Sequence, residues 1–141
     1  MSDILSCTEE EKLVFNKPPE ILDEKVFQQL SKFNSAINLR SLYIEFIEEF
    51  DELMYLIDKA FLEKDKQALI KNLHTIKGNS GTLGANAIFT ISSEADLLAR
   101  AENWDALGTA LKNLVNERVI FNKYLEEETI FNPWITQKKS L

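Results

Sequence analysis

Apolar residues recur every three or four positions through most of the chain, which is the period of an amphipathic α-helix. The longest such run predicts a helix from about residue 39 to about residue 62, with extra apolar neighbours that widen its buried face. Similar runs predict a short helix over about residues 23–33 and longer helices over about 65–84, 85–101 and 103–128. The apolar residues of these runs, including Phe33 at the end of the short helix, are predicted to form the core.

The turn-forming residues agree with a helical fold. No proline interrupts the chain between Pro19 and Pro133, and the dipeptides Asn-Gly and Asp-Gly that favour β-hairpins are absent. Asp23 and Asp65 stand where helix N-caps are expected, and Gly84 stands where a helix should end. The predicted fold is therefore all-α, an antiparallel up-down-up-down four-helix bundle with an additional short N-terminal helix.

These patterns divide the chain into three parts. Residues 1–22 are predicted to be a partly ordered N-terminal arm, residues 23–128 the helical bundle and residues 129–141 a C-terminal tail. The tail contains Trp134 and other apolar residues, and the sequence leaves open whether they pack onto the bundle or bind a partner.

Composition narrows the possible functions. The chain has 141 residues, with 16 Lys and Arg against 23 Asp and Glu, and its net charge of -7 argues against binding to nucleic acid. One Cys and one His argue against a disulfide framework, a metal site and a Ser/His/Asp hydrolase. No apolar run of about 18 residues and no secretory signal is visible, so we expect a cytoplasmic protein without membrane contact.

The single histidine, His74, lies on the helix predicted over about residues 65–84. On a helical wheel its side chain points away from the apolar stripe, so we expect it to face solvent. Gly78 and Gly81 fall within about 40° of His74 on the same wheel. A glycine inside a helix costs roughly 1 kcal/mol relative to alanine. Because a solvent-facing glycine does not serve packing, we interpret the pair as leaving room for a partner to approach the imidazole.

Two lysines flank the histidine. Lys71 and Lys77 are three residues away on either side, where helical residues are surface neighbours, and Ile70 adds an apolar side chain beside the ring. An exposed imidazole between ammonium groups suits capture of a phosphoryl group, because the ring nitrogen can attack while a cation offsets the charge on the oxygens. Inert surface residues would produce the same pattern, so the spacing leaves both interpretations open.

Residues 74–85, His-Thr-Ile-Lys-Gly-Asn-Ser-Gly-Thr-Leu-Gly-Ala, resemble the signature of histidine-containing phosphotransfer (HPt) domains: His, then Lys-Gly, a small residue and a later Gly-Ala. The resemblance implies a four-helix bundle that displays a phosphorylatable histidine. It implies that His74 is the phosphoacceptor through Nε2, that Lys77 stabilises the phosphoryl group and that Gly78 leaves room for the incoming domain. Many family members place Glu or Gln, which can hydrogen-bond the imidazole, where this chain has the shorter Asp96. The resemblance therefore makes Asp96 the candidate for orienting His74.

The function that this resemblance implies is that of an intermediate in a multistep two-component phosphorelay. His74 would accept a phosphoryl group from the aspartyl phosphate of a receiver domain in a hybrid histidine kinase and pass it to the Asp of a response regulator. Mg²⁺ and the acidic pocket would belong to the receiver, so we expect no metal, no cofactor and no kinase activity in this chain. Residues predicted to contact a receiver are Ile70, Lys71, Lys77, Gly78 and Gly81, with exposed apolar side chains of neighbouring helices.

Two other functions fit the same residues. In one, the chain is a non-catalytic helical adaptor that binds receiver domains without taking phosphate. In the other, His74 is phosphorylated directly by the ATP-binding domain of a chemotaxis-type kinase.

Overall fold

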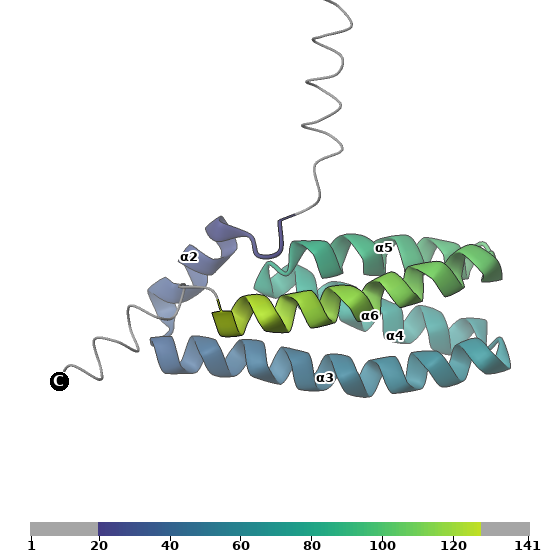
Figure 1. The fold of residues 1–141 in the computed structure, drawn as a ribbon, viewed down its shortest axis with the longest axis horizontal. Coiled ribbons are helices and arrows are strands. Elements are labelled where there is room, and N and C mark those ends of the chain that lie inside the picture. The colour runs from purple at the N-terminus through teal and green to yellow at the C-terminus, as the bar shows by residue number, and fades with distance from the viewer. Residues whose placement is uncertain (1–19, 128–141) are drawn as a thin grey trace, which may run out of the picture.

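The computed structural model describes residues 20–127, and this part of the chain contains helices and no strand. The helices are α2 (Glu24–Phe33), α3 (Ala36–Glu63), α4 (Lys66–Leu83), α5 (Asn86–Arg100) and α6 (Trp104–Glu127). Figure 1 shows α3 to α6 side by side in alternating directions, with the short α2 at one end of the bundle. The predicted all-α bundle with an additional N-terminal helix is confirmed. None of the described helices combines the length and the apolar character needed to cross a membrane.

The helices α2 and α4 begin at the capping side chains that the sequence predicts. The carboxylate of Asp23 accepts hydrogen bonds from the backbone N–H groups of Lys25 and Val26 at the start of α2. Asp65 caps α4 in the same way by accepting from the N–H of Ala68. Such caps satisfy N–H groups that have no partner within the helix, so the first turns form where they were predicted.

Gly84 ends α4 and also joins α2 to the bundle. Its φ of +73° lies in the left-handed region that favours glycine. Its carbonyl accepts a hydrogen bond of 2.7 Å from the N–H of Asp23, and a Cβ at this position would stand only 2.9 Å from Cβ of Val26. Glycine is therefore required here both by the backbone conformation and by the close approach of α2.

The predicted apolar stripes form the core. The core residues of the four helices α3 to α6 are Leu39, Tyr43, Phe46, Ile47, Phe50, Met54, Ile57 and Ala60 of α3, Leu69, Leu73 and Ile76 of α4, Ile88, Ala95 and Ala99 of α5, and Leu107, Ala110, Leu111, Leu114, Phe121 and Leu125 of α6. The prediction for Phe33 was wrong, because this side chain is 87% exposed. Phe33 is the last residue of α2, beyond the turn whose apolar side chains reach the bundle.

Most of the predicted N-terminal arm and the whole predicted C-terminal tail lie outside the described residues. Within the described part, Leu22 is buried in the core although it was assigned to the arm. The division of the chain into arm, bundle and tail therefore stays a prediction, and the packed unit includes at least Leu22.

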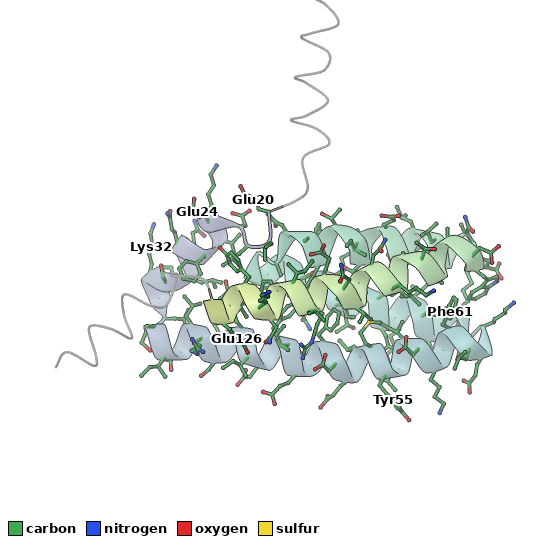
Figure 2. All side chains as sticks on the ribbon, in the orientation of Figure 1. Glu20, Glu24, Lys32, Tyr55, Phe61 and Glu126 are labelled. Atoms are coloured by element: carbon green, nitrogen blue, oxygen red, sulfur yellow. The ribbon has the colours of Figure 1, made fainter. Side chains whose placement is uncertain are left out.

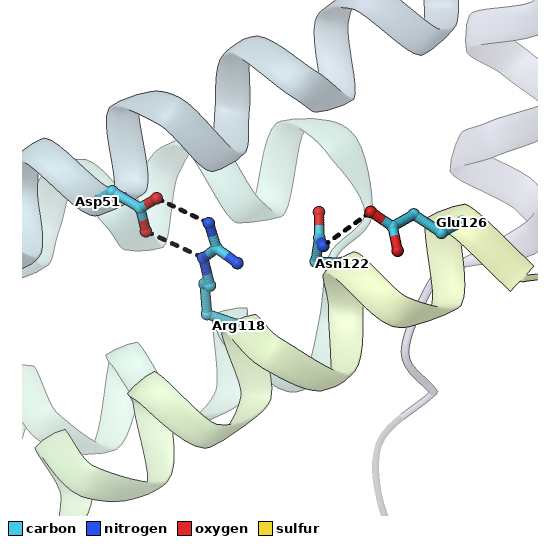
Figure 3. Close-up of polar contacts among 4 residues, drawn as sticks. All are labelled: Asp51, Arg118, Asn122 and Glu126. Carbon is cyan, nitrogen blue, oxygen red and sulfur yellow. Dashed lines mark hydrogen bonds and ion pairs between the residues drawn. The ribbon is translucent and has the colours of Figure 1, made fainter.

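The contact surface between α3 and α6 differs from those between the other neighbouring helices. The ring of Phe121 on α6 packs against those of Tyr43 and Phe46 on α3, with centroids 6.1 and 5.7 Å apart. Arg118 donates two hydrogen bonds to the carboxylate of Asp51, from Nη2 at 2.7 Å and from Nε at 2.9 Å (Figure 3). The hydrogen bond to Asp51 raises the pKa of Arg118 above its usual value. Large side chains and a bidentate ion pair therefore connect these two helices.

Candidate functional site

His74 occupies the middle of α4 and is exposed, as the helical wheel predicts. Leu69, Leu73 and Ile76 lie on the opposite side of the helix and are buried. His74 forms no hydrogen bond or ion pair with any residue between 20 and 127. The imidazole is therefore accessible from solvent, and no described side chain holds either ring nitrogen.

Gly78 follows His74 by one turn and faces open space. A Cβ built at this position meets no atom within 4 Å, apart from the helix's own nearby backbone. Gly78 is exposed and lies inside a helix, where alanine is the more stable choice. Packing within the described residues therefore gives no reason for glycine here, which agrees with the interpretation that it leaves room for a partner.

The prediction that Gly81 plays no part in helix packing was wrong. Gly81 is exposed, but a Cβ there would stand 3.2 Å from two ring carbons of Phe89 on α5. We expected no close helix packing at Gly81, because the wheel places it on the solvent side of α4. A wheel describes one helix alone and does not show that a long side chain of the next helix reaches across its edge. Gly81 therefore makes room for Phe89, whatever further role it has in docking.

The cations beside His74 belong to a helix without acidic residues. The sequence of α4 contains Lys66, Lys71 and Lys77 and no Asp or Glu. Lys71 is exposed and Lys77 half-buried, and neither forms an ion pair with a described residue. Ile70 is half-buried and packs against the core. The helix that carries His74 is thus positively charged although the whole chain carries a net charge of -7.

Asp96 lies on α5 at the level of His74. The contact between Gly81 and Phe89 sets the register of the antiparallel pair α4 and α5. His74 on α4 and Asp96 on α5 each lie seven residues from that contact, which is about 10.5 Å along the helix axis. Asp96 is only 5% exposed, and its carboxylate accepts a hydrogen bond of 3.2 Å from Nε of Arg100.

The predicted role of Asp96 in orienting His74 stays a prediction, since the structure gives its carboxylate a different partner. The sequence analysis missed Arg100. Its position four residues after Asp96 was the available signal, because opposite charges at this spacing pair on a helix surface. Phe89 was missed as well, and it is 37% exposed beside the stripe that carries His74.

This arrangement favours nucleophilic chemistry at one exposed imidazole. A neutral imidazole nitrogen can attack an electrophilic phosphorus atom, and nearby ammonium groups stabilise charge on phosphoryl oxygens. The open space at Gly78 allows another protein's backbone to come close to the ring. No other described residue offers a histidine or cysteine nucleophile.

A family model described as the Hpt domain matches residues 41–120, which run from the first turns of α3 into the last third of α6 and include His74. Histidine-containing phosphotransfer protein B from Pseudomonas aeruginosa PAO1 is similar in structure, with a TM-score of 0.71 at 22% identity over 77% of this chain and 93% of that one. MtHPt2 from Medicago truncatula gives a TM-score of 0.74 at 18% identity, over 93% and 90% of the two chains.

A putative histidine-containing phosphotransfer protein from rice gives a TM-score of 0.70 at 17% identity, over 95% of this chain and 96% of that one. No curated protein matches the sequence. At these identities the solved structures show a shared fold. The family itself follows from the sequence match, which spans more than half of the chain.

Proposed function

Because the chain belongs to the Hpt domain family, we propose that His74 accepts a phosphoryl group from one receiver domain and passes it to another in a multistep phosphorelay. Members of this family are phosphocarriers that interact with receiver domains, and the chain has a histidine phosphotransfer role. The observation that carries the proposal is that this sequence contains one histidine, and the side chain is exposed in the middle of a bundle helix.

The transfer is a displacement at phosphorus. The lone pair of Nε2 of His74 attacks the phosphorus atom of the receiver's aspartyl phosphate. The bond from phosphorus to the aspartyl oxygen breaks, its electron pair returns to that carboxylate, and Nδ1 keeps its proton. In the second half, the carboxylate of another receiver attacks the phosphohistidine and the electron pair returns to Nε2. Neither half consumes ATP, so the chain needs no kinase activity of its own.

The surroundings of His74 support this chemistry. Lys77 and Lys71 supply positive charge for the phosphoryl oxygens. The helix α4 contains no carboxylate, so no negative charge on this helix repels those oxygens. Gly78 keeps the space beside the ring open for the receiver backbone. Ile70 and Phe89 offer apolar contact area near His74.

The direct test measures acid-labile phosphate on the protein after mixing it with a phosphorylated receiver. We expect the wild-type chain to take up label and His74→Gln to take up none. Because His74 is exposed and makes no polar contact with a described residue, His74→Gln should keep the fold, which circular dichroism checks. Label on His74→Gln would overturn the assignment. Receiver binding without any label on the wild-type chain would identify an adaptor instead.

A second experiment distinguishes the relay from direct phosphorylation by a kinase. The chain is incubated with ATP and the ATP-binding domain of a chemotaxis-type kinase, and the labelling rate is compared with that from a phosphorylated receiver. Faster labelling from the receiver supports the relay. Faster labelling from the kinase domain contradicts the relay while leaving His74 as the acceptor.

The role of Gly78 has its own test. Gly78→Gln should fold, since nothing lies near its Cβ, but it should transfer phosphate about tenfold to a hundredfold more slowly, because its side chain keeps the two reacting atoms apart. Thr82→Gln, at an exposed position one turn further along α4, is the matched control and should transfer at the normal rate. Equal rates for the two variants would remove the access explanation.

A further inference from the structure

An apolar groove opens between α3 and α6 at the end of the bundle that contains Glu127, the last described residue. The buried side chains of Tyr43, Ile47 and Leu125 and the exposed Ile44 supply its apolar lining. Its volume of about 170 Å³ far exceeds the roughly 10–15 Å³ that one water molecule requires. We refer to this feature as the α3–α6 groove.

The groove follows from how α3 and α6 are held together. The Phe46–Phe121 ring pair and the Asp51–Arg118 ion pair connect the two helices next to the groove. Helices joined by large side chains stand further apart than helices joined by small ones. The helices α3 and α6 accordingly approach each other much less than α4 and α5 do. The groove therefore results from the wide spacing that these large side chains impose on α3 and α6.

The surface beside the groove also carries exposed apolar side chains. Phe33 at the end of α2 and Ile37 in the first turn of α3 are exposed, and Ile44 lies two turns beyond Ile37 on α3. Exposed apolar side chains that lie next to an apolar groove are typical of a binding surface. This surface is separate from the candidate site, because His74 lies on α4, which faces α6 diagonally across the bundle.

We propose that the α3–α6 groove binds the chain's own C-terminal segment, residues 130–139. The last described residue, Glu127, directly follows Glu126, which lies near the end of α6 (Figure 2) and is one of the residues that line the groove. The segment begins three residues later and contains four large apolar residues, namely Ile130, Phe131, Trp134 and Ile135. An apolar segment joined to the rim of an apolar groove has a high effective concentration there.

The segment is long enough to reach the groove. Trp134 is seven residues beyond Glu127, and seven residues span up to about 23 Å when extended. The part of α6 that lines the groove, from Asn122 to Glu126, covers about 6 Å of the helix axis. A chain that reverses direction after Glu127 therefore brings Phe131 to Ile135 over the groove with length to spare.

Charge favours the same occupant. Lys138 and Lys139 follow the apolar residues of the segment, whereas the exposed side of α3 next to the groove carries Glu48 and, one turn later, Glu52. Glu48 lines the groove itself, as does Arg40 at its other end. An extended segment that places Trp134 in the groove has its two lysines within reach of these two glutamates of α3.

Fluorescence of Trp134 in the full chain tests the proposal. In a Trp104→Phe background, Trp134 is the single tryptophan. We expect its emission to be blue-shifted and its quenching by acrylamide reduced, compared with the same protein unfolded in urea. Ile44→Asp should shift the emission towards the unfolded value. Leu56→Asp is the matched control, because Leu56 is also on α3 and is 46% exposed against 47% for Ile44, but does not line the groove.

Solvent-like emission of Trp134 in the folded chain, or equal emission of the Ile44→Asp and Leu56→Asp variants, would overturn the proposal. A blue shift that disappears on dilution, with dimers seen by sedimentation, would also overturn it by identifying a second copy as the occupant. As a second measurement, Trp134→Ser should speed up amide hydrogen exchange over residues 40–48 without changing the bundle. Uptake of phosphate by His74 should be unchanged in these variants, so the outcome is independent of the proposed function.

Discussion

The α4–α5 and α3–α6 contact surfaces show two ways of joining helices in one bundle. Between α4 and α5, small residues such as Ser80, Ser92 and Ala95 are fully buried, and the helices run close together. Between α3 and α6, aromatic rings and the Asp51–Arg118 ion pair keep the helices further apart. The close α4–α5 contact packs the helix that carries His74 firmly against α5 and brings Phe89 to its edge. The wider α3–α6 contact leaves a groove. Side-chain volume at the contact therefore determines how closely two helices approach and where the bundle leaves a groove.

Removing volume from the open contact should give the largest loss of stability. Phe121→Ala takes away the ring that packs on Tyr43 and Phe46, and we expect the free energy of unfolding to fall by about 3–5 kcal/mol. Urea denaturation measures the loss. Val119→Ala, two residues earlier at an exposed position of α6, is the control and should change stability by less than about 0.5 kcal/mol. Similar losses for both variants would show that the aromatic rings do not hold α3 and α6 together.

Adding volume to the close contact should have the next largest effect. Ala95 is fully buried, and Ala95→Leu forces α4 and α5 apart or strains the new side chain, which should cost about 1–3 kcal/mol. Thermal and urea unfolding measure the loss. Ala101→Leu, just after the end of α5 at an exposed position, should be nearly neutral. An equally stable Ala95→Leu protein would contradict the view that small residues are needed there.

Alanine substitutions at Gly78 and Gly81, the two glycines on the same side of α4 as His74, should change stability by smaller and unequal amounts. Gly78→Ala should raise the free energy of unfolding by about 0.5–1 kcal/mol, because alanine is the better helix former and nothing lies near its Cβ. Gly81→Ala should gain less or lose stability, since the Phe89 ring 3.2 Å away must shift. The comparison is made by urea denaturation of both variants. Equal gains would mean that Phe89 yields without cost.

The ion pair of the open contact should contribute least. Asp51→Asn removes the charge that Arg118 contacts, and because the pair is partly exposed we expect a loss of no more than about 1 kcal/mol. The loss should shrink as salt is added, because salt screens exposed charges. Glu52→Gln, at the next exposed position of α3, is the control and should show no such salt dependence. A loss that is unaffected by salt would mean that Asp51 acts through something other than charge.

The elements of the fold could be predicted because their signals are local. Asp23 and Asp65 cap helices through N–H groups two or three residues away, and Gly84 ends α4 through its own φ angle. The exposure of His74 followed in the same way, since the periodicity of one helix orients each of its side chains. Phe33 shows where this reasoning stops. Its position in the stripe was correct, but whether another helix covers it depends on where α2 meets the bundle.

The candidate site was predictable only where it involves a single helix. The histidine, its lysines and the open Gly78 all lie on α4, so spacing along the sequence was enough to group them. The Phe89 ring against Gly81, the burial of Asp96 and the Asp51–Arg118 pair join different helices.

Amphipathic periodicity and capping are encoded within a few residues, so the sequence alone was sufficient for the helices, the bundle and the exposed imidazole. How closely two helices approach depends on the volumes of side chains from distant parts of the chain. The folded arrangement was therefore needed to reveal the close contact beside His74 and the groove between α3 and α6.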